Sequence, residues 1–472
     1  MTASFLPVVS LLLSALATAH VLLTKREVRA AIGWTAVVWL VPLLGVLLYL
    51  LLGVNRIRRR AEQRRRQRLH APALWEREGE DVPLEALDAQ APTRFAAHAR
   101  LGYRLTRMPL TAGNRLVPLV NGDEAYPAMI AAIDAAEQSL ALCSYILQWD
   151  EVGRAFADAL ERAVARGVRV CVLLDAVGSL LNGRHLCRRG IEARHFNIPT
   201  PLHAAFLNLR THRKILVADG TLGFTGGMNI RDLHQVAGQR PLSSQDMMFR
   251  LEGPVVGQLL AVFDQDWQFA GGAALKGEAW FPQDAHRKQG AAVMRAVPDG
   301  PDMDFSSAGW ILESVLAVAR KRVRITTPYF LPDLGLIGAL SQAALRGVEV
   351  DILVPAASNL PFIRWASQAQ FDALLAYGCR IHLTPPPFDH KKLVVVDDFW
   401  TLIGSSNWDA RSFRLNFELN TEIYDNEVAR RLDSLLAERI RVSTPITYEG
   451  FMARSTALRL RDRAAWLMSP YL

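Results

Sequence analysis

His212-Arg213-Lys214-Ile215-Leu216-Val217-Ala218-Asp219 is followed, 178 residues further along the chain, by His390-Lys391-Lys392-Leu393-Val394-Val395-Val396-Asp397. Both stretches fit the pattern H-x-K-x4-D. A short motif can arise by chance, but lysine is scarce here, with 7 residues against 47 arginines, so two chance matches are improbable. The repeated stretch therefore predicts that the chain contains a duplicated unit.

The residues after each copy follow one plan. An apolar run ends in a turn at Asp-Gly or Asp-Asp, a second apolar run follows, and a loop of small residues delivers an asparagine, Asn229 or Asn407. This pattern predicts a β-hairpin in each copy. The histidine and the lysine lie on one strand, and the asparagine lies just beyond the other.

The segments before each hairpin alternate between helix and strand patterns. In the first copy we expect helices at residues 127–138 and 151–166, and strands at residues 139–145 and 168–174. In the second copy we expect helices at residues 306–320 and 334–346, and strands at residues 323–327 and 348–354. The sequence thus predicts an α/β fold of two similar halves, residues 104–272 and 273–447.

Two uncharged apolar runs lie near the N-terminus, at residues 5–23 and 30–54. Each is long enough to cross a hydrocarbon layer of about 30 Å, so residues 1–55 are predicted to form a two-helix transmembrane hairpin. A cleaved signal peptide is the alternative for the first run, and a buried core helix is the alternative for the second. Lys25, Arg26 and Arg29 lie between the runs, whereas eight arginines follow within residues 56–68. The positive-inside rule then places both flanks and the two halves in the cytoplasm.

The formal net charge of +8 is concentrated in two short segments. Residues 56–68 hold eight arginines against one glutamate, and residues 452–472 hold four arginines against one aspartate. The remainder is close to neutral, so we expect no nucleic-acid partner. Residues 56–103 are predicted to be a basic juxtamembrane linker. Residues 448–472 form a basic amphipathic tail, either an interfacial helix or a surface helix that closes the second half.

The two motifs can build one pocket if the halves face each other. That pocket would contain His212, Lys214, His390 and Lys392, a set that suits phosphoryl transfer at a phosphodiester. One histidine attacks phosphorus to give a phosphohistidine, and the other protonates the leaving oxygen and then deprotonates the incoming alcohol or water. Neither copy has residues at metal-ligand spacing, so we expect no metal and no cofactor.

Other polar residues complete the candidate site. Asn229, Asn407 and Ser405 are the candidate phosphate-binding residues. A nucleophilic imidazole needs an acceptor on its second nitrogen, and Asp246 and Glu418 are the candidates because they lie 34 and 28 residues after their histidines.

The aspartates that end the motifs, Asp219 and Asp397, are counted with the candidate catalytic set. They stand where a strand enters its turn, so we expect that their role is to hold the hairpin in place.

These residues resemble the phospholipase D superfamily, whose signature is two H-x-K-x4-D motifs followed by G-S-x-N or G-G-x-N. Within it, most of the chain is similar to bacterial cardiolipin synthases, through strings such as Phe224-Thr225-Gly226-Gly227-Met228-Asn229-Ile230 and Thr327-Pro328-Tyr329-Phe330-Leu331-Pro332-Asp333. The resemblance implies two phospholipase D-like α/β sandwich halves that form one pseudo-two-fold active site, in a multi-pass protein of the bacterial inner membrane.

The resemblance also implies an activity. A phosphatidyl group would pass without a metal from one phosphatidylglycerol to a second, giving cardiolipin and glycerol, with His212 as nucleophile and His390 as acid and base. The sequence itself does not distinguish the two histidines, and it sets neither the acceptor headgroup nor the oligomeric state. A phospholipase D hydrolase and a membrane-tethered nuclease are the alternatives, since they share the phosphohistidine step. A lipid-binding relic is a third, which the two intact motif sets argue against.

Asp389 is a departure from the family pattern, which commonly has a non-acidic residue before the second histidine. We expect this carboxylate either to raise the pKa of His390, which would favour proton donation, or to face solvent.

Overall fold

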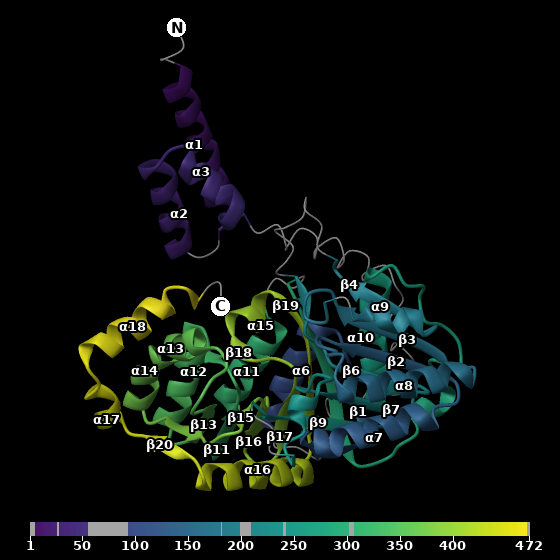
Figure 1. The fold of residues 1–472 in the computed structure, drawn as a ribbon. Helices are drawn as coiled ribbons and strands as arrows, with labels where there is room; N and C mark the ends of the chain where they lie inside the picture. The colour runs from purple at the N-terminus through teal and green to yellow at the C-terminus, as the bar shows by residue number, and fades with distance from the viewer. Residues whose placement is uncertain are drawn as a thin grey trace.

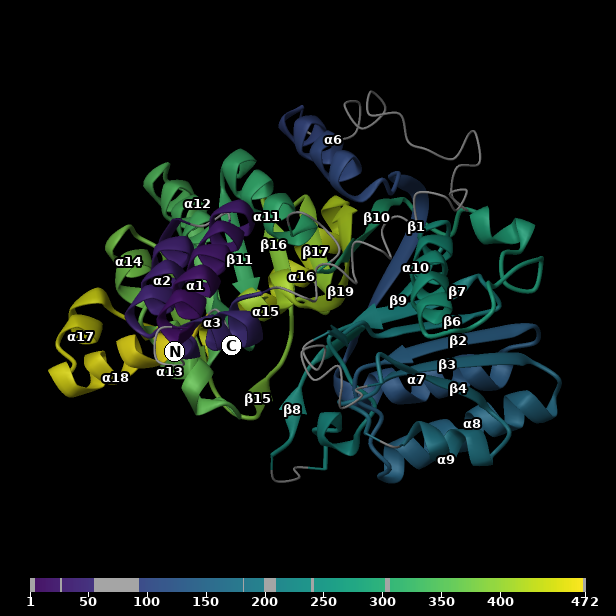
Figure 2. The same ribbon diagram turned by 90° about the horizontal axis from the view of Figure 1, so that it is seen from above.

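The computed structural model describes residues 5–25, 28–54, 93–180, 182–198, 209–238, 242–301 and 306–469. An N-terminal group of helices precedes two similar α/β halves, which lie side by side (Figures 1 and 2). Both halves contribute strands to one large mixed sheet.

The first half begins with strand β1 (Thr111–Val120) and helix α7 (Asn121–Ala135). Its other strands in the sheet are β2 (Ser139–Ser144), β3 (Arg169–Asp175), β4 (Glu192–Phe196), β6 (Ile215–Ala218), β7 (Leu222–Gly226) and β9 (Met247–Glu252). Its other helices are α8 (Glu151–Ala165), α9 (Gly183–Arg188) and α10 (Val255–Phe269).

The second half has the strands β10 (Ala292–Asp299), β11 (Arg322–Thr326), β13 (Glu349–Pro355), β14 (Arg380–Thr384), β16 (Leu393–Val396), β17 (Trp400–Gly404), β19 (Asn416–Tyr424) and β20 (Thr444–Ile446). Its helices include α11 (Ser307–Val318), α12 (Leu334–Leu345), α13 (Pro361–Gln368), α14 (Phe371–Ala376) and α16 (Asn426–Arg441).

The strand order shows that the two halves repeat one topology. Along the sheet the order is β20-β14-β13-β11-β16-β17-β19-β10-β1-β9-β7-β6-β2-β3-β4. Read outward from the central pair β10 and β1, the order in one half matches the order in the other, and β20 is an additional strand at one edge. The hairpins β6–β7 and β16–β17 therefore occupy equivalent positions. Their first strands lie inside the two motifs, and the histidine and lysine come just before each strand, not on it as predicted.

The predicted helices and strands lie within a few residues of the observed ones, except at the start of α7. Sequence reasoning placed that start at Pro127, whereas the helix begins at Asn121 and Pro127 lies inside it. Asp123 and Glu124 occupy the first turn, where negative charge favours a helix N-terminus. Side-chain caps fix other starts: Asp150 accepts the Gly153 N–H in α8, and Asp333 accepts the Leu336 N–H in α12.

Three short strands tie each half to the other. Strand β5 (Arg210–Thr211) pairs with β19 of the second half, and His212 N donates to Phe417 O at 2.8 Å. In the equivalent place β15 (Phe388–Asp389) pairs with β8 (Ser244–Gln245) of the first half, and His390 N donates to Gln245 O at 2.8 Å. Each motif histidine is thus fixed by the backbone of the opposite half.

The N-terminal helices differ from the predicted hairpin. Helix α1 (Phe5–Thr24) agrees with the first apolar run, and its Pro7–Thr24 segment is the one described helix that is long and apolar enough to cross a membrane. The second run was expected to be one helix, but it divides into α2 (Val28–Leu40), α3 (Leu44–Leu48) and the π-helix η1 (Tyr49–Gly53). At 13 residues α2 is only about 20 Å long, too short to span a bilayer alone.

The chain reverses direction after α2. Trp39 donates to the Thr18 hydroxyl at 2.9 Å, so α2 runs back along α1, and Leu43 then turns with a φ of 65°. Returning in α3 and η1, the chain brings the carbonyl of Gly53 within 2.6 Å of the Lys25 ammonium group. Residues 25 and 53 therefore lie at the same end of the helical group.

Two further segments pack on the second half. Residues 94–103, predicted as linker, belong to helix α6 (Arg94–Thr106), whose Phe95 and Ala99 share a core with Ile311 and Val315 of α11. The rest of the predicted linker lies largely outside the described residues.

The tail forms α17 (Tyr448–Met452) and α18 (Thr456–Trp466). Ala465 of α18 is buried against Ala366 of α13. Of the two expectations for the tail, α18 fits the surface helix that closes the second half.

Arg213, the middle residue of the first motif, is fully buried at the contact between the halves. Its guanidinium binds Asp266 of α10 at 2.7 Å and donates to the carbonyls of Glu418 and Asp299. Removing one partner of a buried ion pair leaves the other charge uncompensated. We predict that Arg213→Met lowers the free energy of unfolding by about 3–5 kcal/mol in urea denaturation of the full chain.

Two comparisons complete the Arg213 test. Arg213→Met/Asp266→Leu should recover most of the loss, because it removes both charges. Arg162→Met, which breaks the exposed ion pair with Asp134, is the matched control and should change stability little. Equal effects of the buried and exposed substitutions would contradict the prediction.

Candidate active site

His212 follows β5 and is held by a carboxylate of the second half. Its Nδ1 lies 2.9 Å from Glu418 Oε2, and the His212 side chain is 11% exposed. Burial lowers the pKa of His212, against the opposing charge of Glu418. Burial alone would raise the pKa of Glu418, but His212, Lys214 and Ser405 outweigh it and hold that pKa below its usual value. His212 is therefore neutral, with its Nδ1–H on an ionised Glu418 and the Nε2 lone pair free to react.

His390 has the equivalent arrangement, with a carboxylate of the first half. Its Nδ1 lies 2.7 Å from Asp246 Oδ2, and the His390 side chain is 9% exposed. Burial, followed by the charges of Lys392, Lys214 and Arg231, lowers the pKa of His390 well below its usual value.

Each carboxylate contacts the histidine of the opposite half, and not the histidine that precedes it in its own half. Spacing paired Asp246 with His212 and Glu418 with His390, and that pairing is wrong. Each acid serves the histidine of the other half because β5 and β15 cross to the opposite half before delivering their histidines. The candidate acids themselves are those that contact the rings.

The motif lysines lie beside the histidine backbones. Lys214 Nζ donates to His212 O at 2.5 Å, and Lys392 Nζ donates to His390 O at 2.6 Å. Burial is the main cause that lowers the pKa of Lys214 to about 7 and that of Lys392 to about 8. The charge of Lys392 also contributes to the lowered pKa of Lys214, so the two motifs converge in one electropositive space.

The three predicted phosphate-binding residues, Asn229, Asn407 and Ser405, differ in their hydrogen bonds. Asn229 Oδ1 accepts the Ile146 N–H, while Asn407 Oδ1 is buried without a hydrogen-bond partner among the described residues. The Ser405 hydroxyl, which was predicted to bind phosphate, donates to Glu418 Oε2 at 2.5 Å and so supports the carboxylate. At the equivalent Gly227, a Cβ would lie 2.5 Å from Asp246 Oδ1, so only glycine fits beside the shorter acid.

The last residues of the motifs lie away from the histidines. Asp219 accepts the backbone N–H groups of residues 137–139, and Asp397 accepts those of residues 320–322. Seven residues of extended chain separate each from its histidine, or roughly 20 Å. Their place in the catalytic set stays a prediction, and their contacts favour the anchoring role. They anchor the hairpin to the start of the neighbouring strand, as their position at the turn had suggested.

Asp389 was expected either to raise the pKa of His390 or to face solvent, and it does neither. Its carboxylate is buried and pairs with Lys391 at 3.0 Å and with Arg439 of α16 at 3.1 Å. It neither faces solvent nor raises the pKa of His390, because two nearer cations take up its charge. Asp389 thus fixes β15 to α16.

Sequence reasoning missed two tyrosines that flank the site. The Tyr145 ring packs edge-on against His212 at 5.0 Å between centroids, and the Tyr329 ring packs in the same way against His390 at 6.3 Å. Each follows the strand next to its hairpin, β2 or β11, so comparison of the two repeats could have paired them. Among the described residues, no group of three His, Cys, Asp or Glu side chains is arranged as a metal site.

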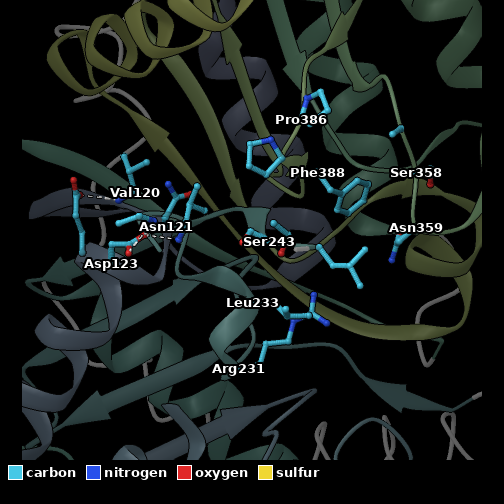
Figure 3. Close-up of a pocket in the computed structure, with 17 residues that line it drawn as sticks. Val120, Asn121, Asp123, Arg231, Leu233, Ser243, Ser358, Asn359, Pro386 and Phe388 are labelled. Atoms are coloured by element: carbon cyan, nitrogen blue, oxygen red, sulfur yellow. Dashed lines mark hydrogen bonds between the residues drawn. The ribbon is translucent and has the colours of Figure 1, made fainter. Parts of the chain in front are cut away.

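A cleft of about 1040 Å³ has Phe388, which lies two residues before His390, in its wall (Figure 3). Its wall includes Phe388, Ser244 and Arg231, and the Phe388 and His390 ring centroids lie 5.9 Å apart. The two oriented imidazoles and the two lysines thus lie close enough to shift one another's pKa values, and the cleft adjoins the second motif at Phe388. Such a site can hold a phosphate group and exchange the alcohol bound to it.

Comparison with known proteins identifies close relatives. A family profile described as "Cardiolipin synthase, PLD-like domain" matches residues 129–267 and 312–440, and one described as "Phospholipase D-nuclease N-terminal" matches residues 12–53. The chain is 34% identical to cardiolipin synthase A of Pseudomonas putida, over 98% of this chain and 96% of that one. It is 31% identical to the major cardiolipin synthase of Bacillus subtilis (strain 168), over 95% of each.

The fold is also similar to a crystal structure of phosphatidylserine synthase from Haemophilus influenzae Rd KW20. The TM-score is 0.61 at 15% identity, and the match covers 80% of this chain and 100% of that one. At this identity the similarity shows the fold alone.

The low pKa of Lys214 predicts pH-dependent anion binding. Lys214 carries its charge below about pH 7 and Lys392 below about pH 8, so both lose charge as the pH rises, whereas the charge of sulfate is constant over this range. We predict that the Kd for sulfate, measured by calorimetry, rises about tenfold from pH 6.5 to 8.5, since a charge-assisted hydrogen bond is lost.

Lys214→Arg should reduce that rise, because guanidinium stays charged. Lys392→Arg should also reduce it, because the pKa of Lys392, about 8, lies within the same pH window. Sulfate binding that does not change with pH in the wild-type protein would contradict the prediction.

Proposed function

We propose that this chain, which belongs to the cardiolipin synthase family of phospholipase D-like proteins, transfers a phosphatidyl group from one phosphatidylglycerol to another, giving cardiolipin and glycerol. The observation that carries this proposal is the pair of buried histidines, each oriented by a carboxylate of the opposite half beside a lysine. This pairing provides a nucleophile and a proton carrier around one phosphate.

In the first step His212 Nε2 attacks phosphorus, and the bond from phosphorus to the glycerol oxygen breaks. His390 gives its proton to that oxygen, so glycerol leaves and phosphatidyl-His212 remains. The bound phosphate places negative charge between Lys214 and Lys392, whose charges contribute to the low pKa of His390 in the free protein. Substrate binding therefore favours the protonated His390 that this step requires.

The second step reverses the first with a new alcohol. Neutral His390 takes the proton from a hydroxyl of the second phosphatidylglycerol, and that oxygen attacks phosphorus. The bond from phosphorus to His212 breaks, which restores the free imidazole. Lys214, Lys392, Asn229 and Asn407 hold the phosphate oxygens in both steps. The family resemblance makes His212 the nucleophile, and Glu418, the longer and more strongly supported acid, is consistent with that role.

A hydrolase is the second candidate, because water could replace the alcohol in the second step. The low exposure of both histidines disfavours it, since the phosphohistidine would be covered by the bound lipid. A nuclease is disfavoured because the net charge outside the two short basic segments is close to neutral.

We also propose an arrangement in the bacterial cell membrane. Helix α1 crosses the bilayer, and α2, α3 and η1 enter and return to the same face, because Lys25 and Gly53 are in contact. Lys25, Arg26 and Arg29 then lie on the same side as the eight arginines of residues 56–68, which agrees with the positive-inside rule. The catalytic halves are cytoplasmic, and the N-terminus lies on the other side.

Cysteine labelling in spheroplasts distinguishes this arrangement from a two-span hairpin. A membrane-impermeant maleimide should label Ser4→Cys in intact spheroplasts and label Thr24→Cys only after permeabilisation. The native Cys187, which is exposed on the first half, is the cytoplasmic control and should behave like Thr24→Cys. The reverse pattern, with Thr24→Cys labelled from outside, would restore the two-span hairpin.

The activity test uses the full chain in detergent with phosphatidylglycerol as the sole lipid. We predict equal amounts of cardiolipin and glycerol by mass spectrometry, and a loss of at least about 10³-fold in both His212→Ala and His390→Ala. Phosphatidic acid as the main product would favour the hydrolase. Absence of any lipid turnover, with cleavage of DNA instead, would refute the proposal.

A further inference from the structure

Arg231 is a cation in the wall of the cleft that the steps above do not use. It is half-buried, and within the described part of the chain no carboxylate lies within ion-pair distance of its guanidinium. Two acids line the same cleft, but their oxygens are engaged elsewhere. Asp123 accepts the N–H of Val236, and Glu124 accepts that of Val120. A half-buried guanidinium without a carboxylate partner is a binding group for an anion.

The neutral imidazole of His234 holds the Arg231 guanidinium in place. Arg231 Nε donates to His234 Nε2 at 3.4 Å, and since arginine cannot accept, Nε2 must carry the lone pair. The proton is then on His234 Nδ1, which donates toward the carbonyl of Ser244, on β8, at 3.3 Å. Burial lowers the pKa of His234 to about 3, so the ring stays neutral beside the arginine. The two terminal nitrogens of Arg231 remain available to a ligand.

The position of Arg231 links it to the second motif. The ring of His234 lies 6.2 Å from that of His390, and the strand β8 that carries Ser244 is the strand that pairs with β15 before His390. On the other side of the cleft the Tyr329 hydroxyl donates to Asn359, which also lines the wall. In Figure 3 Asp123 lies with Val120 and Asn121 at one end of the cleft, and Arg231 lies apart from them beside Leu233. The cleft therefore has a basic region on the side of His390.

We propose that Arg231, oriented by His234, binds the phosphate of the acceptor phosphatidylglycerol and so selects the acceptor. This inference rests on the proposed transferase function. The leaving glycerol and the incoming glycerol headgroup occupy the same position beside His390, because the second step retraces the first. Only the incoming molecule carries a phosphate, at the far end of its glycerol. A cation outside the reacting centre therefore distinguishes the acceptor from the product that has just been released.

The donor phosphate has a separate binding set. It must contact His212 and the two buried lysines at the centre of the site, whereas Arg231 lies in the wall of the outer cleft. The apolar residues around Arg231, among them Leu233, Leu242 and Phe388, provide surface for the glycerol backbone and the first part of the acyl chains. Since exchange between two phosphodiesters changes little bond energy, preferential binding of this acceptor sets which alcohol resolves the phosphohistidine.

The test measures competition between two acceptors in the full-length protein. Phosphatidylglycerol is supplied with excess butan-1-ol, a primary alcohol without phosphate, and glycerol, cardiolipin and phosphatidylbutanol are quantified. In Arg231→Gln we expect the ratio of cardiolipin to phosphatidylbutanol to fall roughly tenfold, the effect of losing a charge-assisted hydrogen bond. Glycerol release at saturating butanol reports the donor step, which Arg231 affects only through its charge on His390, and should change less than that ratio.

Matched variants keep each outcome informative. Arg231→Lys should retain part of the preference, and Arg115→Gln, an exposed arginine on β1, controls for attraction of the anionic micelle. An unchanged product ratio in Arg231→Gln would refute the acceptor role. A joint fall of both products and of glycerol release would assign Arg231 to the donor instead. If the wild-type protein forms neither product, the proposed function itself fails, independently of Arg231.

Discussion

The hydrogen bond between each histidine and a carboxylate of the opposite half is the contact on which the site depends. Glu418 fixes His212 and Asp246 fixes His390, while β5 and β15 pair with strands of the opposite half. Neither half alone contains an oriented imidazole. The central β1–β10 pair and the buried Arg213 therefore have a catalytic consequence, because they hold the two halves in the one register that joins each ring to its acid.

The two halves repeat one fold, but the residues around the two histidines differ between them. The strand order repeats across β1 and β10, but the positions around the acids differ. Gly227 makes room for Asp246, whereas Ser405 donates a hydrogen bond to Glu418. Arg213 reaches a buried aspartate, while the equivalent Lys391 reaches Asp389. The two histidines of the repeat thus have different environments, which suits the proposed reaction, because one histidine acts as the nucleophile and the other as the acid and base.

The sequence predicted those features that depend on residues close together in the chain. Apolar periodicity located the helices and strands of both halves, and the turn chemistry identified Asp219 and Asp397 as hairpin anchors. The exchange of Asp246 and Glu418 could not be read from spacing, because it arises where β5 and β15 cross between halves. Asp389 was misjudged because its partner Arg439 lies on a distant helix. The second membrane run was taken as one helix because its apolar composition hides the turn at Leu43.

The strands that join the halves also restrict how a substrate is enclosed. Many transferases exclude water by closing two domains about a hinge, but here hydrogen-bonded strands run through the junction and both histidines lie on opposite sides of it. A rigid-body opening would break the sheet and separate the rings from their acids. Under the proposed transferase function, exclusion of water would then depend on the bound lipid itself, whose acyl chains would lie over the mouth of the cleft.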